Sequence, residues 1–158
     1  HCAAHLDDDA GFCLYGARSQ AEREQRAARY KSATLPPEAS VLNGGAADAR
    51  VASVAVTVPV GAIFTAESLA AIKMPVGIVE ATADKVLRPA IHSGRVLAQC
   101  GQCRALGAVQ GAGHFDVLSP LPAVVASELG ANASFDRNLL PASYGRIAAF
   151  FQQTLGND

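Results

Sequence analysis

The chain has 158 residues, half of them hydrophobic, and a formal net charge of −1. This size and balance are typical of one soluble globular domain, and the near-neutral charge argues against a nucleic-acid partner. The longest apolar stretch, VASVAVTVPVGAIF, is broken by Ser, Thr, Pro and Gly. A membrane-spanning helix needs roughly 20 apolar residues, so we also expect no membrane span.

The first 50 residues differ in composition from the rest. The acidic stretch HLDDDAGF (5–12) indicates a loop, whereas SQAEREQRAARYKSA mixes charges with strong helix formers. That mixture predicts a mostly solvated helix over about 19–32. Pro36 and Pro37 should end this helix, and Asn43-Gly44-Gly45 is typical of a loop.

From residue 51 onward, apolar strand-like runs alternate with helical patterns. The runs are rich in β-branched and small residues, as expected of strands buried on both faces of a parallel sheet. We expect strands over 51–60, 74–81 and 104–110. We expect helices over 66–73 (capped by Thr65), 89–100, 120–129 and 143–155. This order predicts an α/β fold, a parallel sheet with flanking helices.

The four cysteines form two local pairs. Four cysteines allow three pairings, and short loop closures favour the disulfides Cys2–Cys13 and Cys100–Cys103. Disulfides persist in oxidising compartments, so we predict a secreted or periplasmic protein. Four free thiols in a cytosolic protein are the alternative.

Two titratable side chains follow the second and third predicted strands. Asp84 comes after MPVGIVEA, and His114 comes after RALGAVQ, in the loop GAGHFDVLSP. Neighbouring parallel strands lie about 4.8 Å apart, and catalytic groups of open α/β sheets lie beyond the carboxyl ends of the strands. Taken singly, Asp84 is explained as a helix cap and His114 as a loop residue. Together they predict a carboxylate that orients an imidazole for general-base catalysis.

Asp116 is a rival acid for His114. It stands two residues after the histidine and leads into the apolar run VLSPLP. Its side chain is too close along the chain for a relaxed pairing, so we prefer Asp84.

The segments PVGIVEATADKVLRP and GAGHFDVLSP resemble those of a known family. From about residue 51 the chain resembles the C-terminal part of an α/β-hydrolase, in the dienelactone-hydrolase-like group that includes relatives of platelet-activating-factor acetylhydrolase. The resemblance implies a hydrolase core over 51–158, with Asp84 as triad acid and His114 as triad histidine. It implies a cap- or lid-like connecting segment over 1–50. It also implies an acyl pocket lined by Val60, Ile63 and Phe64.

The nucleophile of such a triad does not stand in this chain. No G-x-S-x-G elbow is found, and in the order Ser, Asp, His the nucleophile precedes both partners. We therefore expect His1 to open a mature or partial chain, with the nucleophile in an N-terminal part of the same hydrolase, on the same or a separate chain. Three strands alone would also leave an apolar sheet edge unpaired.

The resemblance thus predicts a carboxylic-ester hydrolase with a Ser- or Cys-Asp-His triad, a small-molecule ester substrate and no metal or organic cofactor. A non-catalytic α/β-hydrolase-like binding module is the alternative. The sequence C-G-Q-C also suggests a thiol–disulfide oxidoreductase that uses Cys100 and Cys103. That motif follows a predicted helix, where the helix dipole disfavours a thiolate, so we favour a structural bridge.

Two further patterns are weak. His1 and His5 lie near Asp7–Asp9, but their spacing would need a helix to form a metal site, so we expect surface residues. Asn132-Ala133-Ser134 fits the glycosylation sequon, which is common by chance.

Overall fold

The computed structural model describes residues 1–32 and 48–156. The chain divides into two compact units, His1–Arg50 and Val51–Asp158, which we call the N-terminal unit and the sheet unit. The cap-like role expected of the N-terminal unit stays a prediction. Among the described residues, none of the helices combines the length and apolar character that a bilayer crossing requires.

Helix α3 (Gln20–Ser32) confirms the helix predicted over 19–32. It contains no buried residue, as expected of a solvated helix. The predicted helix end at Pro36-Pro37 and the loop at Asn43-Gly44-Gly45 lie outside the described residues.

Two short helices occupy the start of the N-terminal unit, where a loop was expected over 5–12. They are α1 (Cys2–His5) and α2 (Ala10–Cys13). Asp9 precedes α2 and is fully buried, with His1 Nε2 lying 2.8 Å from its Oδ2 atom. A carboxylate tolerates burial only with such a partner, and that partner could not be read from the acidic run alone.

His1 is an exposed residue with a largely covered side chain. Its side chain is 12% exposed, and its ring stacks on that of His5 at a centroid separation of 4.9 Å. The His5 side chain is 54% exposed. Both residues are exposed, as predicted, and Asp9 holds the His1 ring against the N-terminal unit.

Both predicted disulfides are present. Cys2 is bonded to Cys13, and Cys100 to Cys103, so all four cysteines are paired. The first bridge joins α1 to α2 in a unit with little buried apolar surface. Chains of this size usually need a disulfide, a metal or a partner to fold stably.

The sheet unit is built on three parallel strands, which confirms the α/β class. They are β1 (Val54–Thr57), β2 (Val76–Ala81) and β3 (Cys103–Val109), in the order β1-β2-β3. The central strand β2 is buried along almost its whole length, whereas both outer strands are partly exposed. The hydrolase identity of this fold remains a proposal.

Strand β1 is much shorter than the 51–60 run predicted. Val58 has a φ angle of 46°, which lies outside the β region and is unusual for a β-branched residue. Pro59 then has no N–H to donate to a ladder. The composition of the run favoured a longer strand, but its backbone changes direction at Val58, whose N–H still donates to the Val79 carbonyl at 2.9 Å.

A β-bulge interrupts the pairing of β2 with β3. Ile78 pairs with Ala105 and Val79 with Gly107, which leaves Leu106 as the extra residue. An added Cβ at Gly77 would lie 2.5 Å from Leu106 Cδ1, so the absence of a side chain there makes room for the bulged leucine.

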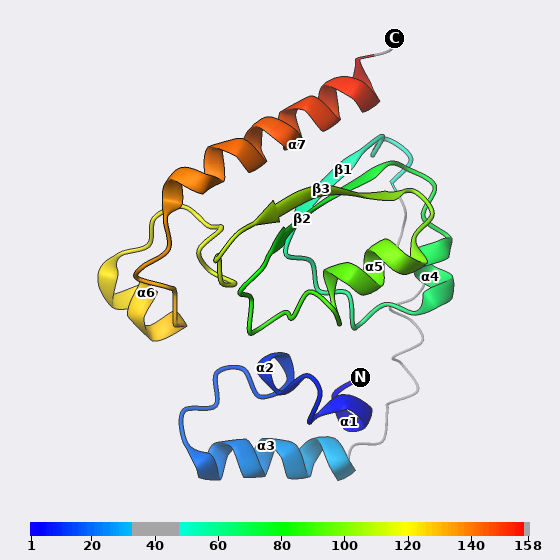
Figure 1. Cartoon of the computed structure of the whole chain (residues 1–158). Helices are drawn as coiled ribbons and strands as arrows, with labels where there is room; N and C mark the ends of the chain where they lie inside the picture. The colour runs from blue at the N-terminus through cyan, green and yellow to red at the C-terminus, as the bar shows by residue number, and fades with distance from the viewer. Residues whose placement is uncertain (33–47, 157–158) are drawn as a thin grey trace. The chain divides into compact units, whose positions relative to one another are not determined.

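Helices cover both faces of the sheet (Figure 1). Helices α4 (Ala66–Ala70) and α5 (Ser93–Gln99) pack with one cluster of apolar side chains that contains Ile78. Helix α7 (Leu140–Leu155) packs with a second cluster that contains Val79. Because Ile78 and Val79 are adjacent in β2 and point to opposite faces, the unit has three layers.

The helices keep their predicted order, and the last two end at the predicted residues 129 and 155, but other helix ends differ. Helix α5 begins late because His92 has non-helical backbone angles, with φ −107° and ψ −85°. Helix α7 begins early, at Leu140, because proline fits the first turn of a helix. Between β3 and α7 the chain forms α6 (Ala123–Leu129) and the short 3-10 helix η2 (Arg137–Leu139).

Helix α4 has the predicted cap. Thr65 Oγ1 accepts a hydrogen bond from the Ser68 backbone N–H at 3.1 Å. A hydrogen bond from its own backbone N–H lowers the pKa of Glu67, and the Thr65 hydroxyl adds to this effect. The helix nevertheless ends at Ala70, short of the predicted residue 73.

A buried histidine fastens the loop after β1 to the start of α5. His92 is fully buried, and its Nδ1 atom accepts hydrogen bonds from the backbone N–H groups of Gly61 at 3.2 Å and Ala62 at 3.4 Å. Arg95 Nη1 adds a bond to the Ala62 carbonyl at 3.1 Å. An added Cβ at Gly61 would lie 2.2 Å from the His92 carbonyl oxygen, so only glycine fits this approach.

We expect Cys2→Ser/Cys13→Ser to loosen the N-terminal unit. The bridge closes a loop with a sequence separation of 11, and its loss should return about 3 kcal/mol of conformational freedom to the unfolded chain. Hydrogen exchange should then accelerate for amides of α1 and α2. The amides of β2 provide the internal reference, and unchanged exchange in residues 1–13 would contradict the stapling role.

Gly61→Ala should destabilise the sheet unit by about 1–3 kcal/mol, because a backbone atom must move to admit the methyl group. Urea unfolding followed by circular dichroism measures this free energy. Gly101→Ala is the matched control, since an added Cβ there meets no atom within 4 Å. Equal stability of the two variants would show that the approach of Gly61 to His92 is not tight.

Candidate active site

The loops that follow β2 and β3 are bonded to each other. The Thr82 N–H donates to the Val109 carbonyl at 3.2 Å, and the Ala83 N–H donates to the Ala112 carbonyl at 2.9 Å. The Gly111 N–H donates to Thr82 Oγ1 at 2.9 Å. These bonds extend the pairing of the two strands beyond their ends, so side chains on the two loops are held close together.

Gly111 gives the second loop its direction. Its φ of +72° lies in the left-handed region, which glycine adopts without steric cost. The turn follows β3 directly and returns the chain toward the loop after β2. The first position of the GAGH stretch, Gly111, therefore favours glycine because of its backbone conformation.

The structure brings Asp84 and His114 together. Asp84 Oδ2 lies 2.9 Å from His114 Nδ1. The other carboxylate oxygen accepts the backbone N–H groups of Val86 at 2.8 Å and Leu87 at 2.7 Å. The Asp84 side chain is fully buried, whereas the His114 side chain is 21% exposed.

This geometry has a direct chemical consequence. A carboxylate accepts hydrogen bonds, so the Nδ1 atom of His114 carries the proton and donates it to Asp84. The lone pair of the neutral ring then lies on Nε2. A partly exposed imidazole with its tautomer held in this way is suited to act as a general base.

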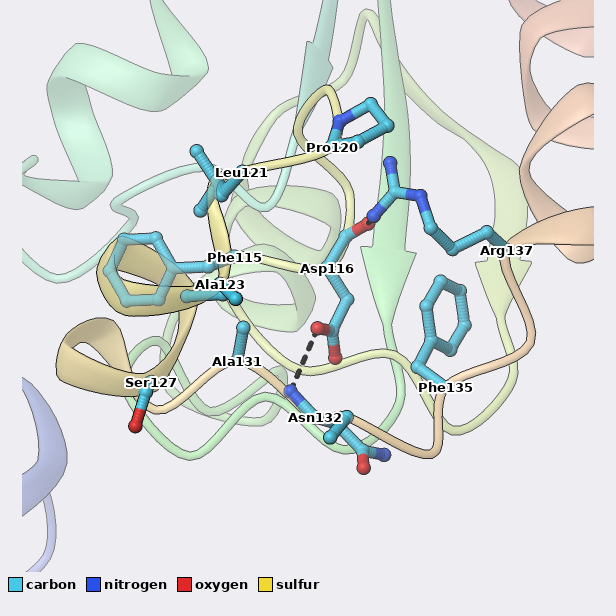
Figure 2. Close-up of a pocket in the computed structure, with 12 residues that line it drawn as sticks. Phe115, Asp116, Pro120, Leu121, Ala123, Ser127, Ala131, Asn132, Phe135 and Arg137 are labelled. Atoms are coloured by element: carbon cyan, nitrogen blue, oxygen red, sulfur yellow. Dashed lines mark hydrogen bonds between the residues drawn. The ribbon is translucent and has the colours of Figure 1, made fainter.

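Asp116 has a different role from Asp84. Its Oδ2 atom accepts the Gly113 N–H at 2.7 Å, and its Oδ1 atom accepts the Asn132 N–H at 2.9 Å (Figure 2). Its backbone carbonyl accepts a bond from Arg137 Nη1 at 3.1 Å. The carboxylate is buried and braces the His114 loop against the segment that follows α6.

A cavity of about 380 Å³ opens beside His114. Besides His114, the polar side chains that line it are Lys85 and Asn132. The others are glycines or apolar, with Phe115 among them. The Phe115 ring meets the His114 ring edge-on at a centroid separation of 4.7 Å.

The three residues expected in an acyl pocket lie elsewhere in the sheet unit. Val60 is half-buried, Ile63 is 62% exposed and Phe64 is 47% exposed, all in the loop after β1. None of them lines the cavity at His114. Their part in substrate binding stays a prediction.

Sequence reasoning missed His92 and the bracing role of Asp116. His92 stands inside a predicted helix with no motif around it, and its partners lie about 30 residues away along the chain. The sequence indicates Asp116 only as a possible acid partner of His114. Its hydrogen bond with the Asn132 N–H joins residues 16 apart in the chain, so the sequence alone does not predict it.

The cysteine motif has a structural setting. Cys100 is 3% exposed at the C-terminal end of α5, and its disulfide to Cys103 leads into β3. A helix C-terminus disfavours a thiolate, and a buried sulfur is poorly accessible to a substrate disulfide. The geometry favours the bridge over redox chemistry.

One group of potential metal ligands occurs in the described part of the chain. The ligand atoms of His1, Asp9 and Cys13 lie within 4.8 Å of one another. The Cys13 sulfur is already bonded to Cys2, so it is not a thiolate. The remaining two ligands, His1 and Asp9, already contact each other at 2.8 Å.

No family model, no curated protein and no solved structure matches this chain. The arrangement of Asp84 and His114 is therefore the main indication of what this chain does.

We expect Asp116→Asn to weaken the His114 loop. The amide replaces one acceptor oxygen with a donor, so either Gly113 or Asn132 loses a partner for its N–H, at a cost of about 1–3 kcal/mol. Urea unfolding should show the loss, and NMR should show shifted amide signals for these two residues. Asp7→Asn, at an exposed position, is the control. A loss no greater than that of the control would rule out the bracing role.

Proposed function

We propose that this chain belongs to a carboxylic-ester hydrolase of the α/β-hydrolase type. The observation that carries the proposal is the 2.9 Å contact between the buried carboxylate of Asp84 and Nδ1 of His114, beyond the carboxyl ends of adjacent parallel strands. The acid precedes the histidine in the chain, which fits the order of an α/β-hydrolase triad. The cavity beside His114 has room for a substrate.

In the proposed reaction, His114 Nε2 takes the proton of a serine hydroxyl or cysteine thiol as that nucleophile attacks the ester carbonyl carbon. The imidazolium that forms is stabilised by Asp84. His114 then gives the proton to the alcohol oxygen, which leaves, and an acyl-enzyme remains. A water molecule attacks the acyl-enzyme with His114 again as base, and the proton returns to the nucleophile as the carboxylic acid departs.

The nucleophile and the oxyanion hole are proposed to come from an N-terminal part of the same hydrolase, on the same or a separate chain. Two observations support this. The sequence contains no G-x-S-x-G elbow. Strand β1 also has no strand partner on its outer edge among the described residues, and an unpaired edge invites another strand.

The two disulfides support an oxidising compartment, and we propose a secreted or periplasmic enzyme. We propose further that the N-terminal unit, which is stapled by Cys2–Cys13, is a cap or lid. Its mostly solvated helix and small core fit a connecting segment better than a catalytic domain.

A non-catalytic hydrolase-like module remains the alternative, because it would share the fold and could keep the contact between Asp84 and His114. A fluorophosphonate probe separates the two, since it labels only an activated nucleophile. Labelling of the full-length protein supports the enzyme, whereas absence of both labelling and ester turnover supports the module.

In the full-length protein, we expect Asp84→Asn to preserve the fold and to reduce kcat for a p-nitrophenyl ester by about 10⁴-fold, because the tautomer of His114 is then no longer fixed. His114→Ala should reduce it at least as much. Circular dichroism checks the fold, and Asp136→Asn, an exposed carboxylate in the same unit, is the matched control. Full activity in Asp84→Asn would remove the assignment of the triad acid.

A further inference from the structure

A second cavity, of about 480 Å³, lies next to the one that contains His114. We propose that it holds the apolar arm of the substrate and so makes the enzyme selective for esters with a medium-length alkyl chain. This inference extends the proposed function to a substrate class. Cavities of this volume are typical of small-molecule sites.

The lining of the second cavity is mainly apolar. Figure 2 shows Phe115 close to Ala123 of α6, with Phe135 on the opposite side of Asp116. The apolar lining side chains include Phe115, Pro120, Leu121, Ala123, Ala126 and Phe135. An alkyl chain is the ligand chemistry that such a surface favours.

The two charged residues of the lining are engaged within the protein. Both carboxylate oxygens of Asp116 accept backbone N–H groups, from Gly113 and Asn132. The Arg137 guanidinium donates to the backbone carbonyls of Asp116 and Leu118. Since both groups already make hydrogen bonds within the protein, part of the cost of covering them with an alkyl chain is already offset.

The two cavities adjoin at Phe115 and Asn132, which line both of them. The edge-on contact of Phe115 with His114 places the start of the apolar cavity one side chain away from the proposed base. An ester whose carbonyl lies near His114 can therefore extend its alkyl chain past Phe115. Short esters would leave the second cavity without a ligand.

Helix α6 supplies a matched pair of positions for the test. Ala126 is half-buried and lines the cavity, whereas Val124 on the same helix is 73% exposed and is not part of the lining. Ala126→Trp should fill the cavity, and Val124→Trp should leave it open. Ala126→Leu fills less of it and guards against a variant that fails to fold.

The first measurement is calorimetric titration of the full-length protein with methyl ketones, which resemble esters but cannot be hydrolysed. We expect 2-undecanone to bind much more tightly than 2-butanone, because each methylene that enters the cavity contributes about fourfold in affinity. Ala126→Trp should abolish this chain-length dependence, Ala126→Leu should reduce it, and Val124→Trp should retain it. Equal affinities for both ketones, or a dependence that survives in a folded Ala126→Leu and Ala126→Trp, would overturn the proposal.

The second measurement is turnover of p-nitrophenyl octanoate and p-nitrophenyl acetate. Ala126→Trp should lower kcat/KM for the octanoate by at least tenfold and leave that for the acetate near the wild-type value. If the wild-type protein hydrolyses neither ester, the proposed function fails, while the ketone titration still decides whether the cavity takes an alkyl chain. A parallel loss on both esters would contradict a selectivity role.

Discussion

Three hydrogen-bond donors converge on the buried carboxylate of Asp84, and the candidate site depends on this convergence. The N–H groups of Val86 and Leu87 occupy one oxygen, which leaves the other directed at His114. A carboxylate without such donors would not remain buried. The same bonds that stabilise the charge therefore orient it, and the parallel strands bring the histidine within its reach.

Much of this arrangement was predictable from the sequence, since the relevant signals are local. The β-branched run of β2 and the apolar pattern of α7 depend on residues close in the chain. The proximity of Asp84 and His114 follows from one further rule, that parallel neighbours end at the same edge of the sheet. The even number and short separation of the cysteines predicted both bridges.

Other features were not predictable, because each depends on a partner that is distant in sequence or on a backbone angle. Asp9 is buried because His1 meets it, although the run around it is acidic. Strand β1 ends early because Val58 turns to positive φ, against the preference of its side chain. The brace from Asp116 to Asn132 joins segments whose proximity only the folded chain reveals.

The bulge in β3 determines which face of the sheet each later side chain of the strand occupies. Leu106 and Val109 are three positions apart, yet both belong to the apolar cluster on the α7 side, which regular alternation along a strand would not allow. The extra residue reverses the in–out pattern midway. The number of residues between Cys103 and the GAGH turn is therefore constrained as strictly as their identity. A residue inserted into or deleted from this strand would move the side chains after it to the opposite face of the sheet.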